Sequence, residues 1–130
     1  MGSKGELVVH GLSESDVAIL TAAGEAGGLE VLVMSGPSEM RQKVRAPHPV
    51  AAVLGIGGKG GVDTGAISLL RFVRRELPVI VVADEDSLEL ERSAREAGIF
   101  YYFVSPLDPK EVKAVVEDVL RQRRSLGAKS

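Results

Sequence analysis

The stretch from Pro78 to Ala83 reads PVIVVA, one proline followed by five apolar residues. An unbroken apolar run of this length, rich in β-branched residues, is typical of a strand that is buried on both faces, as in a parallel sheet. The proline fits the first position of such a strand, because it cannot donate a hydrogen bond to the ladder. This stretch therefore predicts a strand inside an α/β sheet.

Four other predominantly apolar runs occur along the chain, and segments with helical spacing separate them. Strands that alternate with helices through short loops form a parallel sheet covered on both faces. Five such units predict a doubly wound, five-stranded parallel sheet in the order 2-1-3-4-5, as in flavodoxin-like folds. The other predicted strands are Leu7–Val9, Leu29–Met34, Val50–Leu54 and Ile99–Val104.

Local sequence signals, an N-cap in one case and an apolar repeat in the other, support two of the predicted helices. Ser13 offers an N-cap, and Asp16 stands three positions on, close to a capping box. The other helix, near residues 66–77, is predicted from apolar residues that repeat at i, i+3, i+4, i+7 and i+11. We expect these residues to form its buried face. Its members are Ala66, Leu69, Leu70, Val73 and Leu77.

Composition restricts the function. The chain has 130 residues, no cysteine, two histidines and a net charge of −2. Thiol chemistry is excluded, and neither nucleic acid nor an anionic membrane is expected as a partner. No apolar run approaches the length of a membrane span, so a cytoplasmic protein is expected. We expect one domain over residues 1–124 and a flexible tail or the start of a linker at 125–130.

The segment from Ala97 to Asp108 reads AGIFYYFVSPLD. It resembles, without gaps, the run A-G-A-x-x-Y-L-V-K-P-F-x of bacterial response-regulator receiver domains. Residues 78–83, 50–55 and 7–11 resemble the fourth, third and first strands of that family. The resemblance implies a receiver-like fold with a cis peptide bond before Pro106, and a role in two-component signalling.

The chain departs from the family at every position that accepting a phosphoryl group requires. In the family, these positions hold an acidic pair at the end of the first strand, the phospho-accepting aspartate at the end of the third, a hydroxyl at the end of the fourth and a lysine before the proline. The resemblance therefore implies a degenerate receiver that is not an enzyme and needs neither Mg²⁺ nor a cofactor. These positions hold His10, Gly11, Gly55, Ala83 and Ser105.

A glycine-rich stretch follows the third predicted strand and leaves an alternative open. Residues 55–65 contain six of the fifteen glycines, and their amides could cradle an anion or a nucleotide. Residues 59–62 resemble the opening of the deviant Walker A loop of ParA/MinD ATPases, but that loop continues G-K-[ST] where this chain has Asp63-Thr64-Gly65, so the phosphate-binding lysine is missing. The possible anion loop consists of Gly57, Gly58, Lys59, Gly60 and Gly61. The nearby carboxylates are interpreted as solvated or helix-capping groups rather than metal ligands; they are Asp63, Asp84 and Asp108.

Four of the five aromatic residues are contiguous, from Phe100 to Phe103. Strand alternation predicts Tyr101 and Phe103 on one face and Phe100 and Tyr102 on the other. In receivers this strand, with the fourth and fifth helices, forms the surface used for dimerising and binding targets. Aromatic residues are enriched in interfaces, so we expect a protein partner or a second copy to bind here.

The predicted binding residues are Leu88, Arg95, Phe100, Tyr101 and Tyr102. The alternative is that Phe100 and Tyr101 pack under Leu88 and Leu90, beneath a solvated helix. The function predicted from the sequence is thus a phosphorylation-independent, receiver-like interaction module in bacterial signalling or localisation. Binding of a nucleotide or anion by the glycine-rich loop is the alternative function.

Overall fold

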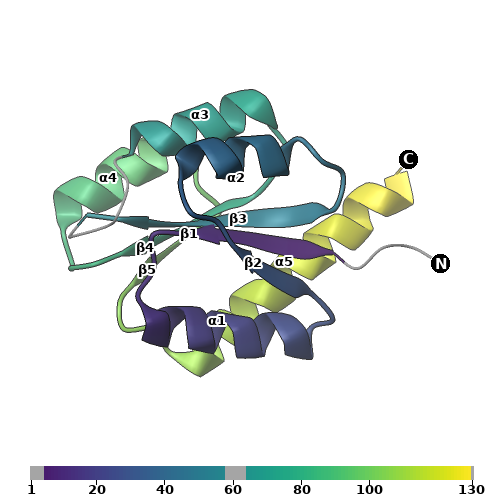
Figure 1. The fold of residues 1–130 in the computed structure, drawn as a ribbon, viewed down its shortest axis with the longest axis horizontal. Helices are drawn as coiled ribbons and strands as arrows, with labels where there is room; N and C mark the ends of the chain where they lie inside the picture. Colours follow the sequence, from purple (N-terminus) through teal and green to yellow (C-terminus); the bar gives the residue numbers. More distant parts are fainter. Residues whose placement is uncertain (1–4, 58–63, 130) are drawn as a thin grey trace.

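A computed structural model describes residues 5–57 and 64–129 of the chain and confirms the predicted fold class (Figure 1). Five parallel strands form one sheet in the order β2-β1-β3-β4-β5. The strands are β1 (Glu6–His10), β2 (Glu30–Val33), β3 (Pro49–Ile56), β4 (Val79–Ala83) and β5 (Tyr101–Val104).

Helices cover both faces of this sheet. α2, α3 and α4 lie over one face, and α1 and α5 lie over the other (Figure 1). The helices are α1 (Glu14–Ala26), α2 (Pro37–Val44), α3 (Gly65–Val73), α4 (Leu88–Glu96) and α5 (Pro109–Lys129).

The sheet divides the core into two clusters. In β1, Leu7 and Val9 pack on the side of α1 and α5, whereas Val8 packs on the side of α2 to α4. All eight residues of β3 are buried, because this strand is covered by helices on both faces and paired on both edges. Each fully buried Leu or Val side chain stabilises the fold by about 1.5–3 kcal/mol, so most of the stability comes from these two layers.

The helix starts follow the predicted chemistry. Ser13 Oγ accepts a hydrogen bond from the amide of Asp16 at 3.2 Å, as an N-cap should. Asp108 Oδ1 accepts one from the amide of Lys110 at 3.2 Å, at the start of α5. The capping box at Ser13 is not completed, because the Asp16 carboxylate is used elsewhere.

The predicted face of α3 was partly wrong. The helix ends at Val73, since Arg74 has extended backbone angles, so Leu77 is buried from the following loop and not from α3. Ile67 and Leu70 are the side chains of α3 that are fully buried against the sheet, and Leu69 is 50% exposed. The two adjacent leucines fit the repeat equally well, and the repeat could not show which of them faced inward.

α5 is longer than its apolar pattern suggested. Its helical backbone continues to Lys129, through residues that the sequence assigned to a flexible tail or the start of a linker. The domain boundary at residue 124 stays a prediction. None of the helices within 5–57 and 64–129 has the length and apolar character needed to cross a bilayer.

Candidate functional site

A pocket opens at the carboxyl edge of the sheet, where α/β folds bind ligands. Its volume is about 190 Å³. The ends of β3, β4 and β5 and the loop between β1 and α1 enclose it. The residues lining it are Gly11, Leu12, Ser13, Asp16, Ile56, Gly57, Val82, Asp84 and Ser105.

Gly55 and Gly11 close the middle of this edge by main-chain contact. A Cβ atom on Gly55 would lie 2.0 Å from the carbonyl oxygen of Gly11 and 2.5 Å from its carbonyl carbon. Gly11 has a φ of 87°, a left-handed conformation that favours glycine. The position that resembles the phospho-acceptor therefore has no room for any side chain.

The other degenerate positions are also occupied by structural contacts. His10 Nδ1 lies 3.1 Å from the carbonyl oxygen of Met34, so its ring is tied to the end of β2. Ala83 is fully buried in the core at the end of β4.

Ser105 is tied to Asp16, which lies on α1 and is only 2% exposed. Ser105 Oγ donates to Asp16 Oδ2 at 2.5 Å, and the amide of Leu107 donates to Asp16 Oδ1 at 3.0 Å. The carboxylate thus holds the turn after β5, which contains the cis Ser105–Pro106 bond that the resemblance implied.

Sequence reasoning interpreted Asp16 only as part of a helix start. A usable signal was present, because Asp16, Leu20 and Gly24 recur every four residues and all three are buried. A carboxylate on the inward stripe of a helix needs hydrogen-bond partners inside the protein. Those partners come from a segment about 90 positions after Asp16 in the chain, and no local pattern shows that the two segments meet.

The glycine-rich loop is described only at its two ends. Gly57 lines the pocket with a φ of 73°, and Gly58, Lys59, Gly60, Gly61 and Asp63 lie outside the described residues. Asp84 stands at the pocket rim, and its amide donates to the carbonyl oxygen of Ile56 at 3.2 Å. Among the described residues, the lining includes two carboxylates and no lysine or arginine. In the described part of the chain, no three His, Asp or Glu side chains gather as a metal site would require.

The aromatic residues of β5 lie on opposite sides of the sheet. Tyr101 and Phe103 pack together with their ring centres 4.7 Å apart, on the side of α1 and α5. The Tyr101 hydroxyl donates to Glu111 Oε2 of α5 at 2.6 Å, and this hydrogen bond, with a smaller contribution from burial, raises the pKa of Tyr101. Tyr102 lies on the α4 side, where burial, followed by the charges of Glu91 and Asp86, raises its pKa.

The predicted position of Phe100 was wrong. Phe100 packs in the same cluster as Tyr101 and Phe103, because β5 begins only at Tyr101 and the strand alternation does not extend back to Phe100. The alternative packing was also wrong. Leu88 is 62% exposed, and Leu90 lies with Tyr102 on the opposite side of the sheet from Phe100 and Tyr101.

β5 is an edge strand, and α4 and α5 flank it on its two faces. We call the surface formed by these three elements the α4-β5-α5 face. Leu88 and Arg95 are exposed on α4, and Arg95 forms a salt bridge of 2.8 Å with Glu91 one turn earlier. The five predicted binding residues all belong to the elements of this face or, for Phe100, to the position directly before β5.

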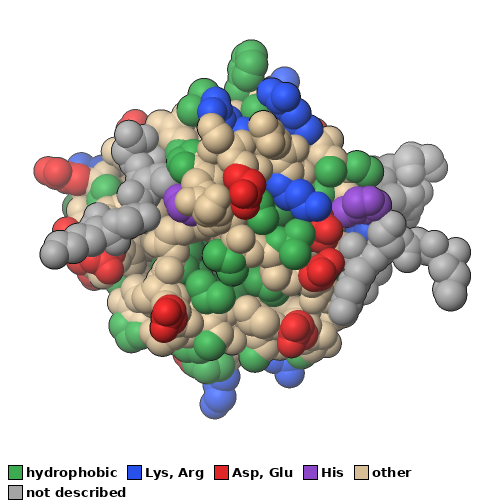
Figure 2. All heavy atoms as spheres, in the orientation of Figure 1, with side chains coloured by type: hydrophobic (Ala, Val, Ile, Leu, Met, Phe, Trp, Pro, Cys, Tyr) green, Lys and Arg blue, Asp and Glu red, His purple; other side chains and the backbone are tan. Residues whose placement is uncertain are grey.

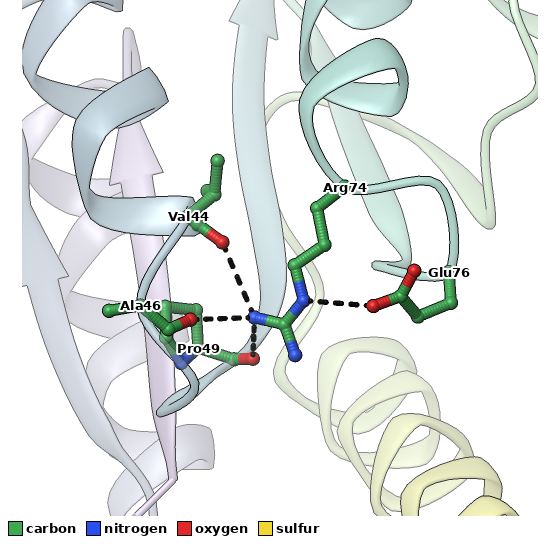
Figure 3. A network of polar contacts seen from close by, with 5 residues as sticks. All are labelled: Val44, Ala46, Pro49, Arg74 and Glu76. Atoms are coloured by element: carbon green, nitrogen blue, oxygen red, sulfur yellow. Dashed lines mark hydrogen bonds and ion pairs between the residues drawn. The ribbon is translucent and has the colours of Figure 1, made fainter.

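Arg74 organises the opposite, amino edge of the sheet (Figure 3). Its guanidinium donates to the carbonyl oxygens of Ala46 at 3.0 Å and Pro49 at 3.1 Å, with a longer contact of 3.4 Å to that of Val44. Its Nε also contacts Glu76 Oε1 at 3.3 Å. One side chain therefore fastens the loop before β3 to the loop before β4. Sequence reasoning did not single out Arg74.

Comparison with solved structures identifies the fold. A receiver domain of a LuxO-type repressor from Vibrio parahaemolyticus superposes with a TM-score of 0.81 at 12% identity, covering 99% of this chain and 98% of that one. A response regulator from Clostridium difficile gives 0.77 at 18% identity over 93% and 98%. A CheY-like receiver domain from Methanospirillum hungatei gives 0.73 at 22% identity over 95% and 99%. The chain has the receiver-domain fold of response regulators.

Sequence comparison finds similarity to a transcriptional regulatory protein. Over 123 residues the chain is 27% identical to the phosphoglycerate transport system transcriptional regulatory protein PgtA of Salmonella typhimurium. That match covers 91% of this chain and 29% of the length of PgtA. No model of a known protein family matches the chain.

Proposed function

We propose that this receiver fold works as a protein-interaction module that does not depend on phosphorylation, in bacterial signalling or localisation. Its partner, or a second copy of the chain, binds the α4-β5-α5 face. The contact between Gly11 and Gly55 carries the proposal. The main chain fills the space that a phospho-accepting carboxylate would need.

The residues at the carboxyl edge do not fit the Mg²⁺ that phosphoryl transfer to a receiver requires. Mg²⁺ needs hard oxygen ligands in a compact octahedral arrangement. His10 is tied to Met34, glycine stands at positions 11 and 55, and the Asp16 carboxylate already accepts two hydrogen bonds from the turn after β5. The module is therefore proposed to act without a metal and without enzymatic activity.

The α4-β5-α5 face supplies the binding surface in this proposal. Tyrosine and arginine are residue types that dominate interface energies, and an exposed leucine adds apolar area that a partner can bury. Leu88, Tyr101 and Arg95 provide them around an edge strand. We expect Leu88→Ser to weaken partner binding tenfold or more, an effect of the order seen at interface hot spots.

Anion binding by the glycine-rich loop has less support. An anion next to Gly57 would face the carboxylates of Asp16 and Asp84 with no lysine or arginine in the described lining. Like charges in a pocket repel, so the pocket disfavours a phosphate group.

Titration with Mg²⁺ and beryllofluoride, followed by amide NMR, tests the proposal. Beryllofluoride mimics a phosphoryl group on a receiver aspartate, and we expect no shifts at the carboxyl edge. Saturable shifts that spread from Gly57 to Tyr102 would overturn the proposal. A parallel titration with Mg²⁺-ATP tests the loop, where saturable binding that Lys59→Ala abolishes would favour the alternative function.

A further inference from the structure

α3 exposes an apolar pair that its neighbours in the fold leave uncovered. The side chain of Phe72 is 89% exposed, and Leu69, one turn earlier on the same side of the helix, is 50% exposed. Together with Leu88 of α4, these are three of the five large apolar side chains that the described part of the chain exposes most. Such a concentration on one layer of a small domain marks an interaction surface.

The two helices α2 and α3 are rich in cations. Residues 37–45 and 65–76, which span α2 and α3, contain six lysines and arginines and only two glutamates. Figure 2 shows basic side chains beside a projecting apolar one at the top of the molecule, over α3. Lys43 pairs with Glu6, and Arg74 is held at the amino edge, but Arg45 and Arg75 are exposed.

α4 carries the opposite charge around its own exposed leucine. Residues 84–96 contain six carboxylates and two arginines, and one of those arginines, Arg95, is already paired with Glu91. Leu88 stands among Glu85, Asp86 and Glu89, which are all exposed. The α2–α3 surface and the α4 surface therefore match each other in charge, and each has an apolar centre.

We propose that the partner for the α3–α4 layer is a second copy of this chain, related by a two-fold axis. α3 and α4 are consecutive helices of one layer (Figure 1). A two-fold axis between them sets α3 of each copy against α4 of the other, so the same contact forms twice and the assembly closes as a dimer. Phe72 and Leu69 supply affinity beside Leu88, and the charges set the register and exclude the reversed arrangement.

This proposal is independent of the function proposed above, which places a partner on the α4-β5-α5 face. The two surfaces share Leu88 but differ at Phe72 on one side and Glu111 on the other. Sedimentation velocity of the purified chain between about 1 µM and about 1 mM covers the range in which small interfaces dissociate. We expect a concentration-dependent dimer that 0.5 M salt weakens, since exposed charges are screened within about 5 Å at that ionic strength.

Phe72→Ser tests the apolar contact. It is expected to weaken the dimer by about tenfold or more, and its exposed position leaves the fold intact. Val33→Ser removes a similarly exposed apolar side chain from β2 and is the matched control, with no expected effect. Glu111→Lys alters the α4-β5-α5 face alone and is also expected to leave this dimer unchanged.

A charge exchange tests the pairing of the two surfaces. One variant carries Arg45→Glu with Arg75→Glu, and the other carries Glu85→Lys with Glu89→Lys. Each alone should be monomeric, because the exchange leaves four cations and four carboxylates on one of its surfaces and so removes the charge attraction in both contacts. Mixed in equal amounts they should form a heterodimer, in which one contact has the wild-type charges and the other has opposite charges at the exchanged positions. Any of three results would overturn the proposal. The wild-type chain could be monomeric at every concentration, or the mixture of the two variants could stay monomeric. The third is a dimer that Glu111→Lys weakens and Phe72→Ser does not.

Discussion

The two edges of the sheet are closed in different ways. At the carboxyl edge, Gly55 and Gly11 bring main chain against main chain, with a glycine-rich loop beside them. At the amino edge, the long side chain of Arg74 bridges two loops that come to within hydrogen-bond distance of its guanidinium (Figure 3). The main-chain contact at the carboxyl edge leaves no room for a side chain, whereas the amino edge depends on the side chain of Arg74.

The two edges therefore differ in role: one is where receivers carry their reactive groups, and the other holds loops of the fold together. Receivers carry their reactive groups at the carboxyl edge, and in this chain Gly55 and Gly11 pack against each other there beside the pocket, where the buried carboxylate of Asp16 holds a turn. The sheet order and the amino edge fastened by Arg74 need no reactive group, and one fold can carry different functions on its surfaces.

Gly55→Asp, which restores the acid that receivers have at this position, should have the largest effect. Because its Cβ would lie 2.0 Å from the carbonyl oxygen of Gly11, the β1–α1 loop must move to accept it. We expect the free energy of unfolding to fall by more than about 3 kcal/mol, measured by urea denaturation.

Gly36→Asp is the matched control for this change. Gly36 is the N-cap of α2 and has open space where a Cβ would stand. The same substitution there should leave stability unchanged or raise it by a few tenths of a kcal/mol, about the difference between Gly and Asp caps. If Gly55→Asp cost no more than Gly36→Asp, the carboxyl edge would not be closed as described.

Arg74→Met tests the amino edge by keeping the apolar stem and removing the guanidinium. Three carbonyl oxygens lose a charged donor, so we expect a loss of about 2–3 kcal/mol in urea denaturation. Arg75→Met at the exposed neighbouring position should change stability by less than about 0.5 kcal/mol. Equal effects from the two variants would contradict the bridging role of Arg74.

Asp16→Ala removes the one buried carboxylate among the described residues that line the pocket. The amide of Leu107 and the hydroxyl of Ser105 lose their acceptor, and a loss of about 2 kcal/mol is expected. Amide NMR should place the largest shifts at Ser105 and Leu107. Glu14→Ala in the same first turn is the control, and comparable shifts after β5 in that variant would argue against a specific role of Asp16.

Glu111→Gln should have the smallest effect, confined to the titration of Tyr101. The hydrogen bond to Glu111 raises the pKa of Tyr101, so the variant should return it toward the ordinary value of about 10. Because the folded protein holds this proton more tightly than the unfolded chain does, the contribution to stability is present below the ordinary pKa and is lost as the pH rises through the raised one.

The chain contains only two tyrosines, so phenolate absorbance reports on both directly. Tyr102 is the internal control, because burial is the main cause of its raised pKa and Glu111 is not among the causes. An unchanged Tyr101 titration in Glu111→Gln would show that the hydrogen bond is not formed in solution.

The fold could be predicted because each strand is an apolar run and the connections are short. Val79–Ala83 indicated burial on both faces, and residues 50–54 indicated a strand, without reference to any distant residue. The inward side of α3 could not be assigned, since Leu69 and Leu70 fit the repeat equally well. Phe100 was placed wrongly because the start of β5 depends on pairing with β4, and sequence alternation does not show where that pairing begins.

The site was less accessible to sequence reasoning, because its contacts join distant segments. Gly55 could be recognised as a missing aspartate, but only the structure shows that Gly11 occupies the space. Asp16 meets Ser105 across 89 positions, and Arg74 meets Ala46 across 28. Hydrogen bonds of this kind are set by the assembled fold and leave only indirect traces in local pattern, such as a carboxylate on a buried stripe.

The central position of β3 sets how the molecule exchanges its amide hydrogens with solvent. Every residue of this strand is buried, and it is paired with β1 and β4 along its two edges. Small openings of α4 or of the edge strands leave those pairings intact, so the β3 amides should exchange only when the whole domain unfolds. Their exchange rates therefore provide a direct measure of global stability in the resting protein, without denaturant.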